Sequence, residues 1–91
     1  MDIPISKTAR QFGYIIWNSV NGMELERILN GKSCIRINFN GVDIGEKNID
    51  RRYHRISVGY KYTRNLPTSD NTYSICIEKN ILQVKTKNAK R

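Results

Sequence analysis

The chain has 91 residues, of which 16 are Lys or Arg and 8 are Asp or Glu, so its formal net charge is +8. A chain of this length closes a single hydrophobic core, and we predict one small domain over residues 1–86 and a basic frayed tail at 87–91. No segment is long and apolar enough to span a membrane and the start does not resemble a secretory signal, so a cytoplasmic location is expected.

The first half of the chain predicts one strand and one helix. Residues 1–11 look irregular and polar, whereas residues 12–17 carry apolar side chains on both strand faces, which is typical of a strand that is central or covered on both sides. Asn21 is a suitable N-cap for a short helix of about residues 21–30. Asn30-Gly31 can end this helix, because glycine adopts the left-handed conformation easily.

Residues 34–62 show the two-residue period of β-strands. A strand over 34–39 leads into Asn40-Gly41, the residue pair that favours a type I′ hairpin, and a return strand follows through 42–49. Residues 55–62 alternate again between apolar and polar side chains, so the sequence predicts a meander of three strands.

The last third of the chain predicts a second hairpin. Residues 63–66 could form a single helical turn or a loop, and the strand of residues 73–77 should turn its odd-numbered side chains inward. The chain then turns at Lys79-Asn80 and returns through residues 81–84. Together the elements predict an α+β, β-rich fold, in which about six short strands in hairpins or a meander form a small sheet or barrel with one short helix.

The segment of residues 51–64, RRYHRISVGYKYTR, contains five Lys or Arg, one His and three Tyr and no acidic residue. Cations interleaved with aromatic rings suit the phosphates and bases of nucleic acid. Strand alternation would send Arg55 and Lys61 to solvent about 20 Å apart, at a rise of roughly 3.3 Å per residue. The same alternation would turn Tyr60 and Tyr62 toward the core, leaving a cationic stripe as the binding surface.

Gly59, in the middle of this segment, would let a nucleic-acid backbone approach closely. Tyr53 is a candidate for stacking on a base or touching a sugar-phosphate, and His54 for a phosphate or base contact. An edge strand that carries Lys and Arg only to prevent aggregation is the alternative. The predicted nucleic-acid-binding residues are Arg51, Arg52, Tyr53, His54, Arg55, Lys61 and Arg64, with Lys7 and Arg10 adding to the attraction.

No constellation of residues predicts an enzyme. His54, the only histidine, has no partners that match a nucleophile, phosphate-loop or metal-ligand motif. Strand alternation places Asp43 on the opposite face from Glu46 and Asp50, so solvated or ion-paired charges are favoured over a Mg²⁺ site. The two cysteines are too far apart in sequence for a paired-cysteine metal motif. We therefore expect a non-enzymatic protein with no metal and no cofactor.

The second half of the chain resembles the AbrB-type swapped-hairpin DNA-binding module over residues 55–85. In this stretch Arg55 opens an Ile/Val strand, a helical turn ends at Leu66, a polar turn passes through Asp70, and a closing hairpin runs through 73–85. Gly59 stands where that family usually has proline. The resemblance implies an obligate dimer of interleaved hairpins that binds DNA through basic residues of its early strands and loops.

These features predict a small non-enzymatic nucleic-acid-binding protein, with DNA favoured over RNA, that acts in transcription regulation or as a DNA-targeting factor. Two alternatives stay open: a protein inhibitor or adaptor whose basic face docks on an acidic partner, and an RNA-binding accessory protein. Because a chain this small gains buried surface by self-association, a homodimer is a further expectation.

Overall fold

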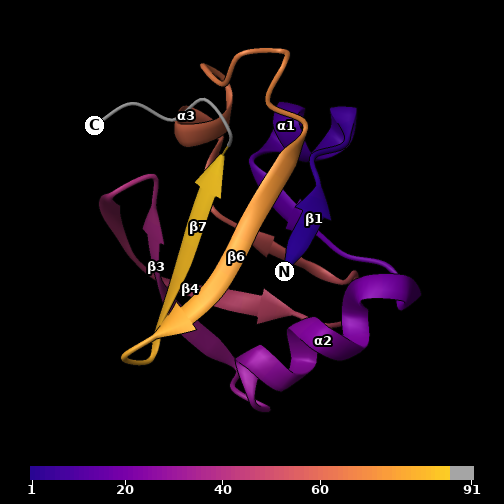
Figure 1. The fold of residues 1–91 in the computed structure, drawn as a ribbon, viewed down its shortest axis with the longest axis vertical. Coiled ribbons are helices and arrows are strands. Elements are labelled where there is room, and N and C mark those ends of the chain that lie inside the picture. The colour runs from indigo at the N-terminus through magenta and orange to yellow at the C-terminus, as the bar shows by residue number, and fades with distance from the viewer. Residues whose placement is uncertain (87–91) are drawn as a thin grey trace.

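The computed structural model describes residues 1–86, which form a β-rich domain of seven strands and three short helices (Figure 1). The predicted frayed tail, residues 87–91, lies outside the described residues. The predicted α+β, β-rich class is confirmed, although residues 1–86 contain one strand and two helices more than the sequence predicted. In chain order the elements are β1 (Asp2–Pro4), α1 (Lys7–Phe12), β2 (Tyr14–Ile16), α2 (Ser19–Leu29), β3 (Cys34–Phe39), β4 (Val42–Asp50), β5 (Arg55–Ser57), α3 (Tyr60–Thr63), β6 (Thr72–Glu78) and β7 (Ile81–Thr86).

The seven strands form one curled sheet with the order β1-β6-β7-β3-β4-β5-β2. Neighbouring strands are antiparallel except β3 and β7, which run parallel with Arg36 opposite Ile81. The sheet is nearly closed: Tyr73 in β6 donates its hydroxyl hydrogen to the carbonyl oxygen of Tyr14 in β2, at 3.1 Å. Helices α1 and α3 lie together at one end of the sheet and α2 lies at the other end (Figure 1).

A single hydrophobic core fills the inside of the curled sheet. Every strand contributes to it, and α2 covers it with Leu25 and Leu29. Tyr73 is the largest fully buried side chain, and burial raises the pKa of its hydroxyl to about 12, although the positive charge of Arg10 opposes part of the shift. The strand residues with no more than 2 % exposure are Ile3, Ile15, Ile35, Ile37, Ile56, Tyr73, Ile75, Leu82 and Val84.

The N-terminal segment is regular, not irregular as predicted. Ile3 in β1 pairs opposite Tyr73 in β6, and this pairing between distant residues leaves no local sequence signal. Helix α1 begins after Ser6, whose hydroxyl oxygen accepts a hydrogen bond from the N–H of Ala9 at 3.0 Å, and it ends at Gly13 with φ of 78°. The short polar stretch between β1 and Gly13 is therefore a capped helix.

The predicted strand over residues 12–17 is shorter and differently placed. Because the left-handed backbone of Gly13 ends α1, Phe12 belongs to a helix, and β2 contains only three residues. β2 pairs with β5 alone, so it is an edge strand and the predicted central position is wrong. Ile15 faces the core while Tyr14 and Ile16 lie on the other face, half-buried.

Helix α2 begins earlier than predicted and ends where predicted. Its N-cap is Asn18, whose side-chain oxygen accepts from the N–H groups of Val20 and Asn21, and the side chain of Asn21 accepts from the N–H of Asn18. The two asparagines form a capping box, which adds residues before the predicted cap at Asn21. Asn30 (φ 53°) and Gly31 (φ 74°) end the helix in left-handed conformations. None of the helices in residues 1–86 has the length and apolarity needed to cross a membrane.

Both predicted hairpin turns are confirmed. Asn40 and Gly41 have φ of 50° and 88°, as a two-residue type I′ turn requires, and Lys79 and Asn80 have φ of 55° and 64°. Strands β3, β6 and β7, which flank these turns, carry their apolar residues inward in the predicted alternation. In β4 the first residue, Val42, is exposed, and Ile44 and Ile49 face the core.

The third strand of the meander is shorter than predicted. β5 ends at Ser57, and Gly59, with φ of 116°, turns the chain into helix α3. Tyr60 is 53 % exposed at the start of this helix, so its predicted inward orientation is wrong. Tyr62 is half-buried against the ring of Phe39, with ring centres 6.1 Å apart. Residues two apart lie on the same face of a strand but on roughly opposite sides of a helix, so Tyr60 and Tyr62 point in different directions in α3.

Candidate nucleic-acid interface

The basic segment of residues 51–64 is divided among three surface locations. Residues 51–54 form the turn between β4 and β5, and Arg55 opens β5, whereas Lys61 and Arg64 lie in and just after α3. The prediction that Arg55 and Lys61 project from one strand is therefore wrong, because the chain leaves the sheet before Lys61. The predicted cationic stripe is replaced by three groups of residues, one at the β2–β5 edge, one facing α2 and one between α1 and α3.

Aromatic rings and guanidinium groups contact one another in a continuous row along the β2–β5 edge of the sheet. The ring of Phe12 stacks on that of Tyr14, with centres 6.1 Å apart. The guanidinium carbon of Arg55 lies 4.6 Å from the ring centre of Tyr14 and 4.8 Å from that of Tyr53. The guanidinium carbon of Arg52 lies 5.8 Å from the ring centre of Tyr53. These five residues, Phe12, Tyr14, Arg55, Tyr53 and Arg52, are named here the ring–guanidinium row.

Strand register explains the middle of the row. In the antiparallel pair, Tyr14 lies opposite Ser57 and Ile16 opposite Arg55, so Tyr14 and Arg55 are diagonal neighbours on one face. Ile15 pairs opposite Ile56, and these two side chains fill the core on the other face. The pairing of β2 with β5 therefore brings a tyrosine from the N-terminal part of the chain over an arginine of the basic segment.

The two rings near the ends of the row face solvent. Phe12 is 53 % exposed and Tyr53 is 58 % exposed, whereas Tyr14 and Arg55 are half-buried. Exposed rings can stack on bases while neighbouring guanidinium groups attract phosphates. Arg55 shares its charge with Asp50, 3.5 Å away, but Arg52 forms none of the ion pairs found within residues 1–86.

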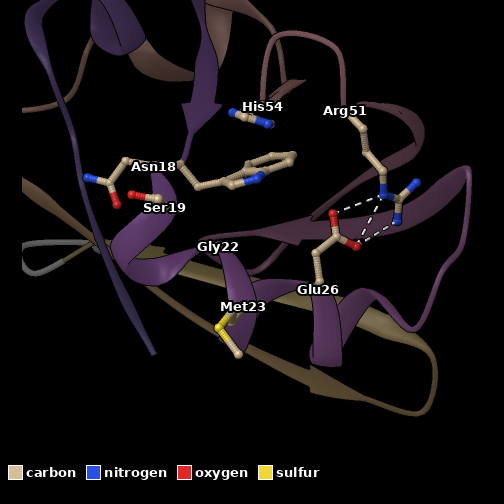
Figure 2. Close-up of a pocket in the computed structure, with 8 residues that line it drawn as sticks. Asn18, Ser19, Gly22, Met23, Glu26, Arg51 and His54 are labelled. Carbon is tan, nitrogen blue, oxygen red and sulfur yellow. Dashed lines mark hydrogen bonds and ion pairs between the residues drawn. The ribbon is translucent and has the colours of Figure 1, made fainter.

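Arg51 and His54 line a different feature, an open pocket of about 580 Å³ between the β4–β5 turn and α2. Figure 2 shows Arg51 turned toward α2, where its guanidinium donates to both carboxylate oxygens of Glu26 at 2.9–3.1 Å. The ring of His54 lies 6.1 Å from that of Trp17 on the other side of the pocket. Arg51 is therefore held in an ion pair. Neither Arg51 nor His54 belongs to the ring–guanidinium row, although both were predicted to bind nucleic acid.

The remaining predicted cations gather between α1 and α3. Lys7, Arg10 and Arg64 line a second open pocket of about 320 Å³ together with Gln11 and Tyr60. Lys61 also lies in α3, with its ammonium nitrogen 5.1 Å from the ring centre of Tyr62. The structure thus brings residues from the start of the chain together with the end of the basic segment.

The acidic residues weighed as a metal site are occupied by local contacts. Arg36 donates to Asp43 at 2.7 Å, and this hydrogen bond, with a second from the N–H of Gly45, lowers the pKa of Asp43. Asp50 accepts from the N–H of Tyr53 and lies beside Arg55. Within residues 1–86 no three His, Cys, Asp or Glu residues are grouped so that they could hold a metal ion.

Four residues of the ring–guanidinium row and of the pocket between α1 and α3 were not predicted from the sequence to bind a ligand. For Tyr14 a signal existed, because residues 12–17 alternate and only one face of a strand turns inward when the sheet encloses a single core. For the others, exposure depends on helices α1 and α3, which the strand pattern did not reveal. The missed residues are Phe12, Tyr14, Gln11 and Tyr60.

Comparison with protein-family models, curated proteins and solved structures finds no match to this chain. The resemblance of residues 55–85 to the AbrB-type module is tested by none of these comparisons and stays a prediction. Light scattering after gel filtration would test the dimer that the resemblance implies.

Proposed function

We propose that this chain is a small non-enzymatic nucleic-acid-binding protein that holds a single strand along the ring–guanidinium row. The observation that carries the proposal is the exposure of Phe12 and Tyr53 in a row whose other members include two guanidinium groups. A solvent-facing ring is a stacking surface for any unpaired base. A basic patch without rings would bind phosphates alone and would not favour an unpaired strand.

The charge of the chain supports the same proposal. The formal net charge is +8, and neither Arg52 nor Lys61 takes part in the ion pairs found within residues 1–86. Such cations raise the local concentration of a polyanion and release its counterions on binding. If about four phosphates are neutralised, log K should fall against log salt with a slope of about −2.8 for a single strand.

A fluorescence-anisotropy titration tests the proposal directly. Short oligonucleotides of single-stranded DNA, duplex DNA and RNA are compared at several salt concentrations. We expect the single strand to bind more tightly than the duplex of the same sequence, because bases in a duplex are not free to stack on Tyr53. The RNA arm tests the sequence-based prediction that DNA is the preferred partner.

Ring variants identify the surface that binds. Tyr53→Leu and Phe12→Leu keep an apolar side chain but remove the ring, and each should weaken single-strand binding about tenfold, since one base–ring stack contributes about 1–3 kcal/mol. Val42→Thr, at an exposed apolar residue that opens β4, is the matched control and should bind as the wild type does. Ring variants that keep wild-type affinity would contradict the proposal. No binding to any oligonucleotide would favour the docking of an acidic protein instead.

A further inference from the structure

We infer that the pocket between α1 and α3 is a phosphate subsite, which binds one phosphate group of the nucleic acid while the bases contact the ring–guanidinium row. The inference rests on the proposed function and adds a second, separate surface to it. The pocket measures about 320 Å³ and is lined by Lys7, Arg10, Gln11, Tyr60 and Arg64. Three of these five side chains are cations and none is a carboxylate, which is the composition that a phosphate group requires.

Among residues 1–86, no ion pair neutralises the cations of the pocket. The ion pairs found within residues 1–86 involve Arg36, Arg51 and Arg55, and none involves a residue of the pocket. Asp70, whose backbone carbonyl accepts from Arg10, is fully buried and does not line the pocket. Three like charges gathered on two packed helices repel one another, and an anion that enters between them relieves this repulsion.

Arg10 is held in place without losing its charge. Its guanidinium donates to the carbonyl oxygens of Leu66 at 3.0 Å, Pro67 at 3.2 Å and Asp70. Carbonyl groups carry no formal charge, and these three hydrogen bonds leave two of the five N–H donors of the guanidinium for a ligand. A cation that is fixed before binding loses little side-chain entropy when the anion arrives.

Helix geometry directs the other side chains to the same place. Lys7 and Gln11 are four residues apart along α1, and Tyr60 and Arg64 are four residues apart along the α3 turn, so each pair shares one helix face. The guanidinium of Arg64 lies 5.8 Å from the ring centre of Tyr60, which orients both groups. The amide of Gln11 and the hydroxyl of Tyr60 add neutral hydrogen-bond donors for phosphate oxygens.

The two helices are held together by short contacts at Gly13 and Thr63. The carbonyl oxygen of Gly13 accepts from the N–H groups of Val58 at 2.8 Å and Gly59 at 3.1 Å. The hydroxyl of Thr63, fully buried, donates to the carbonyl oxygen of Arg10 at 2.9 Å. The pocket is therefore formed by the fold before any ligand binds.

Charge-neutral variants of the exposed cations test the inference. Lys7→Gln and Arg64→Gln retain helix-forming side chains of similar length, and Lys79→Gln serves as the control. Lys79 is exposed in the β6–β7 turn, at the end of the molecule opposite to α1 and α3 (Figure 1). Each pocket variant should weaken single-stranded DNA binding about threefold to tenfold and reduce the salt slope by about 0.7, whereas the control should change affinity less than twofold.

A terminal phosphomonoester and an internal phosphodiester present the same oxygens, and the oligonucleotide distinguishes them. The titration is repeated with the same single-stranded DNA carrying or lacking a 5′-phosphate. If the 5′-phosphate tightens wild-type binding at least fivefold and Arg64→Gln removes this gain, the pocket binds a terminal phosphate. If the 5′-phosphate has no effect but the pocket variants still weaken binding, an internal phosphodiester occupies the pocket. Either result supports the phosphate subsite.

Two results would contradict the phosphate subsite. Pocket variants that match Lys79→Gln in both affinity and salt slope, while Tyr53→Leu weakens binding, would overturn the phosphate subsite and leave the proposed function intact. A wild-type protein that binds none of the oligonucleotides would overturn both. Circular dichroism of each variant confirms that the fold is retained, as expected for substitutions of exposed side chains.

Discussion

Gly13→Ala should destabilise this protein far more than Gly41→Ala, although both glycines have a left-handed backbone. Gly13 has φ of 78° at the end of α1, and Gly41 has φ of 88° in the β3–β4 turn. A Cβ added at Gly41 would meet no atom within 4 Å. A Cβ added at Gly13 would lie 2.4 Å from the carbonyl carbon of Gly59 and from the nitrogen of Tyr60, which are backbone atoms that cannot rotate away.

The two costs can be estimated from these contacts. The left-handed conformation of an alanine costs about 1–2 kcal/mol, and this term applies to both variants. At Gly13 the backbone segments must also separate, which breaks the hydrogen bonds from Val58 and Gly59 to the Gly13 carbonyl oxygen at a cost of about 1 kcal/mol each. We therefore expect a loss of about 1–2 kcal/mol for Gly41→Ala and about 3–4 kcal/mol for Gly13→Ala.

Urea unfolding followed by far-ultraviolet circular dichroism measures both values. In a domain of this size 1 kcal/mol corresponds to about 4–8 °C in the melting temperature, so thermal melts should separate the two variants as well. Equal destabilisation of Gly13→Ala and Gly41→Ala would refute the reasoning, because it would mean that the close approach of Gly13 to Gly59 does not contribute. The same result would mean that this contact does not hold α1 and α3 together around the pocket.

Three further predictions concern alkaline stability, an ion pair and a helix cap. Stability should fall between about pH 10 and about pH 12, because the folded state keeps Tyr73 protonated (pKa about 12) while the unfolded chain loses that proton near pH 10. The difference in pKa corresponds to about 3 kcal/mol of stability. Urea unfolding across this pH range should show that Tyr73→Phe lacks this part of the loss. Glu26→Gln frees Arg51 and should steepen the salt slope for single-stranded DNA by about 0.7 in the anisotropy titration; an unchanged slope would show that Arg51 does not face the ligand. Asn18→Ala removes the N-cap of α2 and should cost about 1 kcal/mol in thermal melts, whereas Ser19→Ala, which keeps the cap, should be nearly neutral.

Parts of the candidate site could be foreseen because their signals are local. The concentration of cations and tyrosines in residues 51–64 is visible in the sequence, and Tyr53 was expected to face a ligand. The separation of Arg55 from Lys61 could not be foreseen, because the period of two continues through Tyr60 and Tyr62 although the chain turns at Gly59. The partner of Arg51 could not be foreseen either, because Glu26 is 25 residues away on a helix.

Local sequence was sufficient for the β-rich class, both hairpin turns and the end of α2. Each of these depends on residues that are neighbours in the chain, such as Asn40-Gly41, where a left-handed backbone is needed at adjacent positions. The pairing of β1 with β6, the parallel pairing of β3 with β7 and the edge position of β2 were decided by the closing of one core among distant segments. The packing of these segments around the core also determined which cations became ion-paired and which aromatic rings stayed exposed, since exposure is a property of packing and not of residue type.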